Sequence, residues 1–150
     1  MRISRKTDYA MRVLFTLLDE QGTRPVSIRV LAEKNQIPKP FLEHIMLEMK
    51  AEGWVKSTPG KNGGYVLGEN PEKITMGEIV RCFDGPHSLL SDNEDLEGND
   101  DNQGIHRFRL VLLQIRNMTF QLMDQATLAS VKGTVPGTPF HDDVMGGLGI

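Results

Sequence analysis

The sequence predicts a mainly α-helical fold with one small β-hairpin. Three observations lead to that prediction, and all of them lie in residues 27–68. Apolar residues recur with helical spacing in two short segments, residues 28–35 and 40–52, which only a short turn separates. Beyond the second segment the apolar spacing changes to the alternation of β-strands. A helix, a tight turn, a helix and a hairpin in this order are typical of a winged helix-turn-helix.

The two helices of this motif have recognisable ends. Ser27 is a residue type that caps the first turn of a helix, and Gln36-Ile37-Pro38 ends the first helix. Pro40 suits the first turn of the second helix, where a missing N–H costs nothing, and Gly53 suits its end. In a helix-turn-helix the second helix contacts the bases, so residues 40–52 would be the helix that reads DNA, called the reader helix below.

The predicted hairpin joins residues 54–57 to residues 65–67 through a glycine-rich loop that carries one cation, Lys61. Glycine would let this loop approach a phosphate backbone closely. The same helices and hairpin could also be plain scaffold in a protein that never touches DNA. A Walker-type phosphate loop is excluded, because Gly60-Lys61 is followed by Asn62 and lacks the required spacing.

The chain as a whole has 150 residues, enough for one domain with an appended helix or tail. Its composition, 39% hydrophobic and 25% charged, is ordinary for a soluble globular protein. The apolar run Val13 to Leu18 is too short to cross a bilayer or to act as a signal, so no membrane partner is expected. The single cysteine, Cys82, excludes an internal disulfide and fits a reducing cytoplasm.

The net charge of −3 is unequally distributed along the chain. Residues 1–64 hold eleven lysines and arginines against seven acids, so this part carries +4 and the remainder carries −7. Local charge near the phosphates governs the electrostatic attraction to DNA. The distribution therefore favours DNA binding although the total charge does not.

A first helix is predicted from about Ser4 to Glu20, with Arg5 and Lys6 in its first turn, after Arg2. These three cations could contact phosphates beside the reader helix, or they could be the solvated start of a helix. Asp8 suits the positive end of the helix dipole, which explains it without a binding role.

A further short helix is predicted over residues 76–83, because Thr75 and Glu78 form the pattern of a capping box. Cys82 lies on this helix with no second cysteine and no base close to it in the sequence. We expect a buried inert thiol there and not a nucleophile.

Residues 85–102 hold six acids and no lysine or arginine, which predicts a mobile acidic loop that ends near residue 104. Its carboxylates could be imagined as a metal site together with His87 and His106. No regular spacing of ligands is present, so a solvated loop is the preferred interpretation and no metal site is expected.

Residues 105–132 read as one helix of roughly 40 Å, which is longer than a domain of this size needs. Its apolar surface is broader than one contact face needs, so we expect it to pack against a second copy. Residues 133–150 are rich in glycine and proline and predict a flexible tail, in which His141-Asp142-Asp143 is a frayed end and not a metal site. The predicted dimerisation residues are Phe108, Val111, Leu112, Ile115, Met118 and Leu122.

Three segments resemble the IscR/NsrR-type (Rrf-two) family of bacterial transcription regulators: RISRKTDYAMRVL, LAEKNQIPKPFLEHIMLEMKAEGWVKSTPGKNGGYVLG and MGEIVRCFDG. The resemblance is close over residues 1–85 and looser over the long helix. It implies a homodimer of winged-helix domains, crossed through the long helices, that binds a palindromic operator in double-stranded DNA. Carried over by position, the DNA-binding residues are Arg2, Arg5, Lys6, Ser27, Lys39, Pro40, Phe41, Glu43, His44, Lys56, Lys61 and Asn62.

Within this set the resemblance gives Glu43 a specific role. Glu43 occupies the position at which such regulators use a glutamate to read cytosine, and a carboxylate can accept a hydrogen bond from a base amino group. A simple exposed helix charge is the alternative. The cations Arg2, Arg5, Lys6, Lys56 and Lys61 would hold the DNA backbone.

The sequence departs from the family at the sensor loop. The resemblance implies an iron–sulfur cluster held by three cysteines before the long helix, and this loop has none. His106 and Asp8 stand where some members place other ligands, but thiolates supply most of the affinity for such clusters. We therefore expect no cluster and no cofactor. Control would pass to an unknown small-molecule effector, to a partner protein or to protein concentration.

We expect a cytoplasmic, sequence-specific transcription regulator, and among regulators a repressor. Its predicted parts are a DNA-binding domain (residues 1–84), an acidic loop (85–104), a dimerisation helix (105–132) and a tail (133–150). The alternative is a winged-helix interaction module that no longer binds an operator. An enzyme has no support, since no catalytic, cofactor or metal pattern stands outside the acidic loop.

Overall fold

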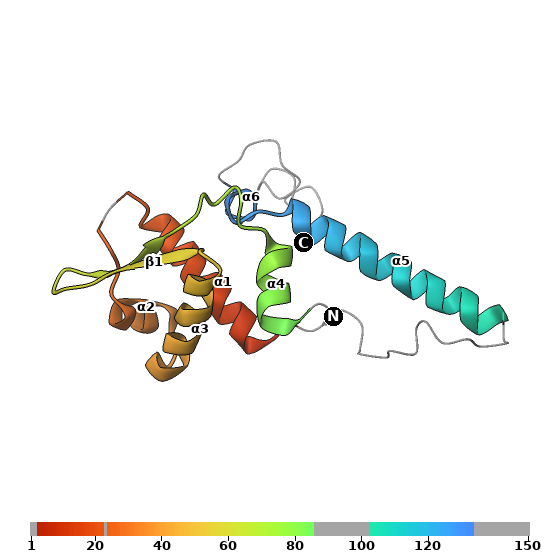
Figure 1. Cartoon of the computed structure of the whole chain (residues 1–150), viewed down its shortest axis with the longest axis horizontal. Helices are drawn as coiled ribbons and strands as arrows, with labels where there is room; N and C mark the ends of the chain where they lie inside the picture. Colours follow the sequence, from red (N-terminus) through yellow and green to blue (C-terminus); the bar gives the residue numbers. More distant parts are fainter. Residues whose placement is uncertain (1–2, 23, 86–102, 134–150) are drawn as a thin grey trace.

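A computed structural model describes residues 3–22, 24–85 and 103–133 (Figure 1). The mainly helical fold with a hairpin wing is confirmed. The predictions for Arg2, for residues 86–102 of the acidic loop, which include His87, and for residues 134–150 of the tail lie outside this description. The elements are α1 (Arg5–Asp19), α2 (Ile28–Asn35), α3 (Lys39–Ala51), β1 (Val55–Thr58), β2 (Gly64–Leu67), α4 (Met76–Asp84), α5 (Gln103–Gln125) and α6 (Leu128–Val131).

Side-chain caps fix the starts of the helices where the sequence predicts them. The Ser27 hydroxyl accepts a hydrogen bond from the Val30 N–H at the start of α2. At the start of α4, Thr75 and Glu78 form the complete capping box, in which each side chain bonds the other residue's backbone N–H. Such caps satisfy N–H groups that have no partner within the helix.

The core of the fold is built around α1, which contacts α2, α3, α4 and β2. Aliphatic side chains of α1, α2, α3 and α4 are fully buried, and burying each one stabilises the fold by about 1.5–3 kcal/mol. Tyr65 and Phe83 lie partly buried at the border of this cluster. The largest fully buried side chains are Leu14, Leu17, Leu31, Leu42, Ile45, Met46, Met49, Ile74, Ile79 and Leu128.

The hairpin wing is an antiparallel pair in which Val55 faces Leu67 and Thr58 faces Gly64. Its second strand also pairs with the chain before α2, because Val26 and Tyr65 exchange two backbone hydrogen bonds of 2.9 and 2.8 Å. A Cβ atom at Gly64 would lie 2.5 Å from the carbonyl carbon and oxygen of Val26. This glycine is therefore required by the fold itself.

The C-terminal helix differs from the single helix predicted over residues 105–132. Helix α5 ends at Gln125, and the short α6 begins after Thr127, whose hydroxyl caps it. The chain between them pairs with the segment before α4: the Met76 N–H donates to the Ala126 carbonyl (2.7 Å), and the Leu128 N–H donates to that of Ile74 (2.8 Å). Continuity was the wrong prediction, because capping and this distant pairing outweigh the helical spacing of the apolar residues.

Helix α5 projects away from the domain on the side of α4 and α6, while the hairpin points to the opposite end (Figure 1). None of its 23 residues is buried in this single chain. Among the described residues, no helix is both long and apolar enough to cross a membrane.

Candidate nucleic-acid interface

The turn between α2 and α3 is held by a residue in the left-handed region. Gln36 has φ of +56°, and its N–H donates to carbonyls in the last turn of α2. The next N–H, of Ile37, returns to the Ala32 carbonyl at 2.9 Å, and the Ile37 side chain is buried. Pro38 then caps α3 through its carbonyl, which accepts from the Phe41 and Leu42 N–H groups at 3.0 Å each. This turn fixes the angle between the two helices.

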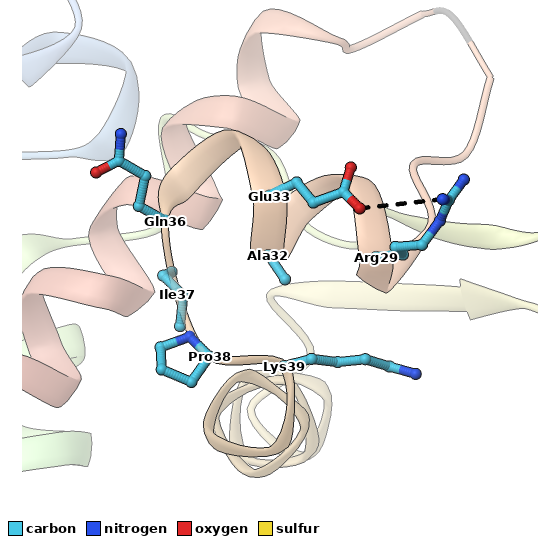
Figure 2. Close-up of a pocket in the computed structure, with 7 residues that line it drawn as sticks. All are labelled: Arg29, Ala32, Glu33, Gln36, Ile37, Pro38 and Lys39. Atoms are coloured by element: carbon cyan, nitrogen blue, oxygen red, sulfur yellow. Dashed lines mark ion pairs between the residues drawn. The ribbon is translucent and has the colours of Figure 1, made fainter.

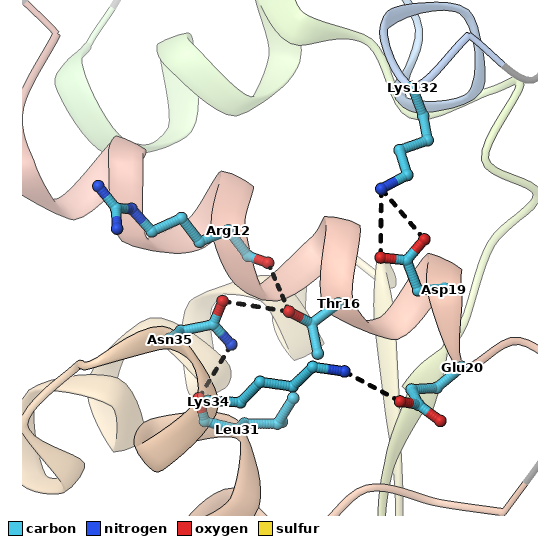
Figure 3. Close-up of polar contacts among 8 residues, drawn as sticks. All are labelled: Arg12, Thr16, Asp19, Glu20, Leu31, Lys34, Asn35 and Lys132. Carbon is cyan, nitrogen blue, oxygen red and sulfur yellow. Dashed lines mark hydrogen bonds and ion pairs between the residues drawn. The ribbon is translucent and has the colours of Figure 1, made fainter.

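Polar contacts attach α2 to α1 from the other side (Figure 3). The buried Thr16 hydroxyl lies 3.0 Å from the Arg12 carbonyl and 3.1 Å from the Asn35 side-chain oxygen. The Asn35 amide donates in turn to the Leu31 carbonyl at 2.9 Å. An ion pair between Lys34 and Glu20 (3.0 Å) closes the outer edge. The helix-turn-helix is thus fastened to the core as a rigid unit.

The reader helix α3 divides into a buried and an exposed face. Leu42, Ile45, Met46 and Met49 are buried, and every predicted reader residue lies on the exposed side. One of these, Glu43, lies 3.8 Å from the Lys39 ammonium, one turn earlier. The predicted reader residues of α3 are Lys39, Pro40, Phe41, Glu43 and His44.

Phe41 is held in place although it is 42% exposed. Its ring meets Tyr9 of α1 edge to face, with 5.7 Å between ring centroids and 84° between ring planes. This geometry is favourable for two aromatic rings and limits the rotation of Phe41. An apolar edge fixed beside Glu43 can contact a thymine methyl group or a sugar.

A hollow of about 340 Å³ separates α2 from the start of α3 (Figure 2). Arg29, Ile37, Pro38 and Lys39 are among the residues that line it. Arg29 is only loosely paired with Glu33, at 4.0 Å. The two helices of the motif thus each contribute one cation to this hollow, beside the carboxylate of Glu33.

A second hollow, of about 610 Å³, lies between the hairpin tip and the start of α2. Arg24, Ser27, Lys61 and Asn62 all line it. The structure thus brings the predicted DNA-binding residue Ser27 together with Lys61 and Asn62, which lie more than 30 positions later in the sequence. Its two cations can hold an anionic strand by charge attraction.

The wing also contacts the end of the reader helix. The Lys50 ammonium lies 2.7 Å from the Ser57 hydroxyl of β1, which links the end of α3 to the hairpin. Lys56, the neighbouring residue on β1, is exposed. Its charge adds to that of Lys61 along the hairpin.

Lys6 has a partner within the protein. Its ammonium lies 2.6 and 2.8 Å from the two carboxylate oxygens of Glu48 on α3 and 5.4 Å from the centre of the Phe83 ring. The contact fastens the start of α1 to the reader helix, and phosphate contact by Lys6 stays a prediction. Arg5, one residue earlier, is exposed.

Three residues of this surface were not predicted as site residues. Arg24 and Arg29 line the two hollows, and Leu47 is 65% exposed on α3. Helical spacing could have found Leu47, which follows Glu43 by one turn on the same face. No sequence pattern could have found Arg24, since its place depends on the fold of the hairpin.

Comparison with known proteins decides the family. A family model described as "Rrf2: Iron-dependent Transcriptional regulator" matches residues 3–133. The chain belongs to the Rrf2 family. The transcriptional regulator CymR of Bacillus subtilis (strain 168) is 31% identical over 137 residues, which cover 91% of this chain and 94% of CymR.

Solved Rrf2-type structures give the same result. The structure of CymR, the global cysteine regulator of B. subtilis, matches with a TM-score of 0.68 at 31% identity, over 85% of this chain and 93% of that one. T. potens IscR matches with a TM-score of 0.68 at 28% identity, over 86% of this chain and 84% of that one. This Rrf2 protein is therefore a DNA-binding transcription regulator of winged-helix fold and not an enzyme.

The description of the Rrf2 family names iron, and this chain has few side chains that could bind it as a cluster. Iron–sulfur clusters are held by thiolates, and the whole sequence has one cysteine. Burial and the nearby carboxylates of Glu52 and Glu48 raise the pKa of the Cys82 thiol, which keeps it protonated. Asp8, a ligand position suggested by the resemblance, is paired with Arg12 at 2.9 Å. These residues do not fit a cluster.

Proposed function

We propose that this Rrf2 protein is a repressor that binds a palindromic operator as a homodimer, without an iron–sulfur cluster. The observation that carries the proposal is the arrangement of the reader face. Glu43 and Phe41 stand exposed on α3, and the two hollows that adjoin α2 are lined in part by cations, Arg29 and Lys39 in one and Arg24 and Lys61 in the other. The helix-turn-helix and the wing thus offer base contacts and phosphate contacts together.

The apolar face of α5 supports the homodimer. Five of its apolar residues are separated by three, four, three and four positions, which is the spacing of a seam between two paired helices. These side chains are 51–60% exposed in the single chain, and patches of this kind mark interaction surfaces. Leu112 lies half-buried beside them. The seam consists of Phe108, Val111, Ile115, Met118 and Leu122.

A two-fold dimer implies a palindromic operator, because each subunit presents the same reader face to its own half-site. Repression follows from the simplest use of such a dimer. A protein that covers an operator overlapping a promoter blocks the polymerase there without any further contact. Transcription in vitro from such a promoter should fall as the protein is added, and a rise would contradict the repressor assignment.

Selection from random duplex DNA by the purified protein tests the DNA-binding part of the proposal. Enrichment of a palindrome supports a sequence-specific dimer. No enrichment of any sequence would favour the alternative, a winged-helix module that binds another protein.

Substitutions then separate base reading from backbone holding. Lys61→Ala should weaken binding to all duplexes alike. It should also reduce the slope of log affinity against log salt concentration by about one per subunit. Glu43→Ala should relax the preference at one base pair of each half-site, where discrimination falls by roughly 1–3 kcal/mol. Glu52→Ala is the matched control, an exposed acid at the other end of α3. A uniform change in all three variants would show that Glu43 reads no base.

A further inference from the structure

The joint between the DNA-binding domain and α5 is built from four side-chain positions on α4 and α5. The Arg81 guanidinium lies 2.6 Å from the Asp124 carboxylate and 5.5 Å from the centre of the Phe120 ring. Both partners of the ion pair are only partly exposed, so the pair is less screened than a free surface pair. Asp124 and Phe120, one turn apart on α5, thus hold Arg81 from two sides.

The fourth position, Gly77, leaves room for this contact. A Cβ atom there would collide with a carboxylate oxygen of Asp124 and would lie 3.0 Å from its Cγ and 3.1 Å from an Arg81 nitrogen. Glycine costs about 1 kcal/mol in a helix relative to alanine. Its presence on α4 is explained by the close approach of the Asp124 side chain.

The end of α5 is also clamped through its backbone. Just beyond Asp124, the Ala126 carbonyl accepts from the Met76 N–H at 2.7 Å, and Thr127 pairs with Thr75. The remainder of α5 has no buried residue and projects from the domain (Figure 1). Within one subunit, α5 is therefore attached to the domain at its C-terminal end.

We propose that Arg81 and Asp124 are positioning residues that fix the angle between the DNA-binding domain and α5, and thereby the distance between the two half-sites that the dimer binds. The proposal rests on the homodimer and operator proposed above. It adds a source of specificity that touches no base, because the spacing of half-sites is a geometric property of the dimer.

A small tilt at the joint is enough to change the spacing of the half-sites. In the proposed dimer α5 is held along its seam, so a tilt at the joint moves the DNA-binding domain. One base pair corresponds to about 3.4 Å along the duplex, and a tilt of about 6° moves a point by this amount when it lies about 34 Å from the joint, the length of the 23 residues of α5. Adding or removing one base pair also rotates one half-site by about 35° around the DNA axis. Both subunits can therefore bind only if the joint permits the shift and the rotation together.

The test measures the affinity of the dimer for operators whose half-sites are separated by the selected spacer, or by one or two base pairs more or fewer. We expect the unchanged protein to prefer one spacer. Asp124→Ala should reduce the ratio of affinities between the preferred and the neighbouring spacers by at least about tenfold, since the second half-site adds affinity only where both can be engaged together. Its affinity for an isolated half-site should not change.

Gly77→Ala is the second variant, because it keeps both charges and displaces the Asp124 carboxylate with a methyl group. It should lose spacer preference as Asp124→Ala does. Asp19→Ala is the matched control, because it removes a similar ion pair outside α5. The Asp19 carboxylate lies 3.1 Å from the Lys132 ammonium, which also lies 5.9 Å from the centre of the Phe15 ring. The control should keep the preference of the unchanged protein.

A measurement without DNA completes the test. Spin labels at Glu69→Cys in a Cys82→Ser background report the distance between the two DNA-binding domains of the dimer. Asp124→Ala should broaden that distribution and Asp19→Ala should not. Spacer preference and label distances that stay unchanged in Asp124→Ala and Gly77→Ala would overturn the proposal. Absence of operator binding or of a dimer in the unchanged protein would overturn the proposed function, and this inference with it.

Discussion

Replacing Leu128 by alanine tests whether α6 is part of the DNA-binding domain. Leu128 is fully buried in the same cluster as α1, and its N–H donates to the Ile74 carbonyl at 2.8 Å. The substitution keeps that backbone bond and removes three carbon atoms from the core. Buried leucine-to-alanine changes cost about 2–5 kcal/mol, and a short surface helix can partly collapse, so we expect about 3 kcal/mol. The melting temperature should fall by roughly 6–12 °C.

Urea unfolding followed by tryptophan fluorescence is the appropriate assay. The chain has one tryptophan, Trp54, which is buried beside Phe83 and therefore reports on the DNA-binding domain. Val131→Ala is the matched control on the same helix, since Val131 is exposed and its loss should change the free energy of unfolding by less than about 0.5 kcal/mol. Both variants should be unfolded at two protein concentrations, because dimerisation adds a concentration-dependent contribution.

Equal urea midpoints for Leu128→Ala and Val131→Ala would contradict the prediction that burial of Leu128 stabilises the domain. That result would mean that α6 rests on the surface and that the core closes without it. A loss of helical signal in Leu128→Ala with no change in the tryptophan transition would lead to the same conclusion.

Four further predictions concern other parts of the chain. Ile115→Asp places a charge in the α5 seam and should give a monomer of 16.8 kDa by light scattering at micromolar concentration, where the unchanged protein gives about twice that mass; a dimer of the variant would contradict the seam. Gln36→Gly should raise the free energy of unfolding in urea by about 0.5 kcal/mol, because glycine removes the left-handed penalty but adds freedom to the unfolded chain; a loss of stability would show that the turn is not strained. Burial and nearby carboxylates raise the pKa of Cys82, so its thiolate fraction at pH 8 is lower than that of a free thiol. Alkylation of Cys82, followed by mass spectrometry, should therefore be slower than alkylation of free cysteine and should accelerate as the pH rises; a rate equal to that of free cysteine would refute this. Anaerobic purification should give no stoichiometric iron or sulfide and no visible charge-transfer band, and the appearance of all three would show that a cluster forms.

The features that the sequence predicted well are those decided by neighbours in the chain. The cap at Ser27, the capping box at Thr75 and the exposed face that carries Glu43 depend on residues within one or two helical turns. Local preferences and the fold agree at these positions, so local reasoning is sufficient.

The features that it missed depend on distant contacts. The pair between Lys6 and Glu48 spans 42 positions, and no periodicity relates its partners. The break after Gln125 has a local sign, since Thr127 and Ser130 form a capping pair, but the apolar spacing continues through it. What decides the break is the pairing of Thr127 with Thr75, which only the folded domain supplies.

The glycine-rich wing shows how one pattern can have two causes. Glycine at its tip was interpreted as room for a phosphate backbone. The structure shows that Gly64 is required by the Val26 backbone and that a Cβ atom at Gly63 would lie 2.8 Å from the Pro59 carbonyl carbon. DNA contact at the wing is therefore supported by Lys61 and by the hollow that Lys61 and Arg24 line together.

The position of Leu128 in the core has a consequence for the order of events during synthesis. A chain grows from its N-terminus, and the reader helix has left the ribosome long before α6 is made. Because the domain buries Leu128 and pairs its backbone with Ile74, the nascent reader cannot reach its final stability until α5 has also been translated. In the proposed homodimer, each new subunit thus completes its DNA-binding domain only after the α5 seam has been made. A folded DNA-binding domain without a seam, which could bind half of an operator, is therefore disfavoured.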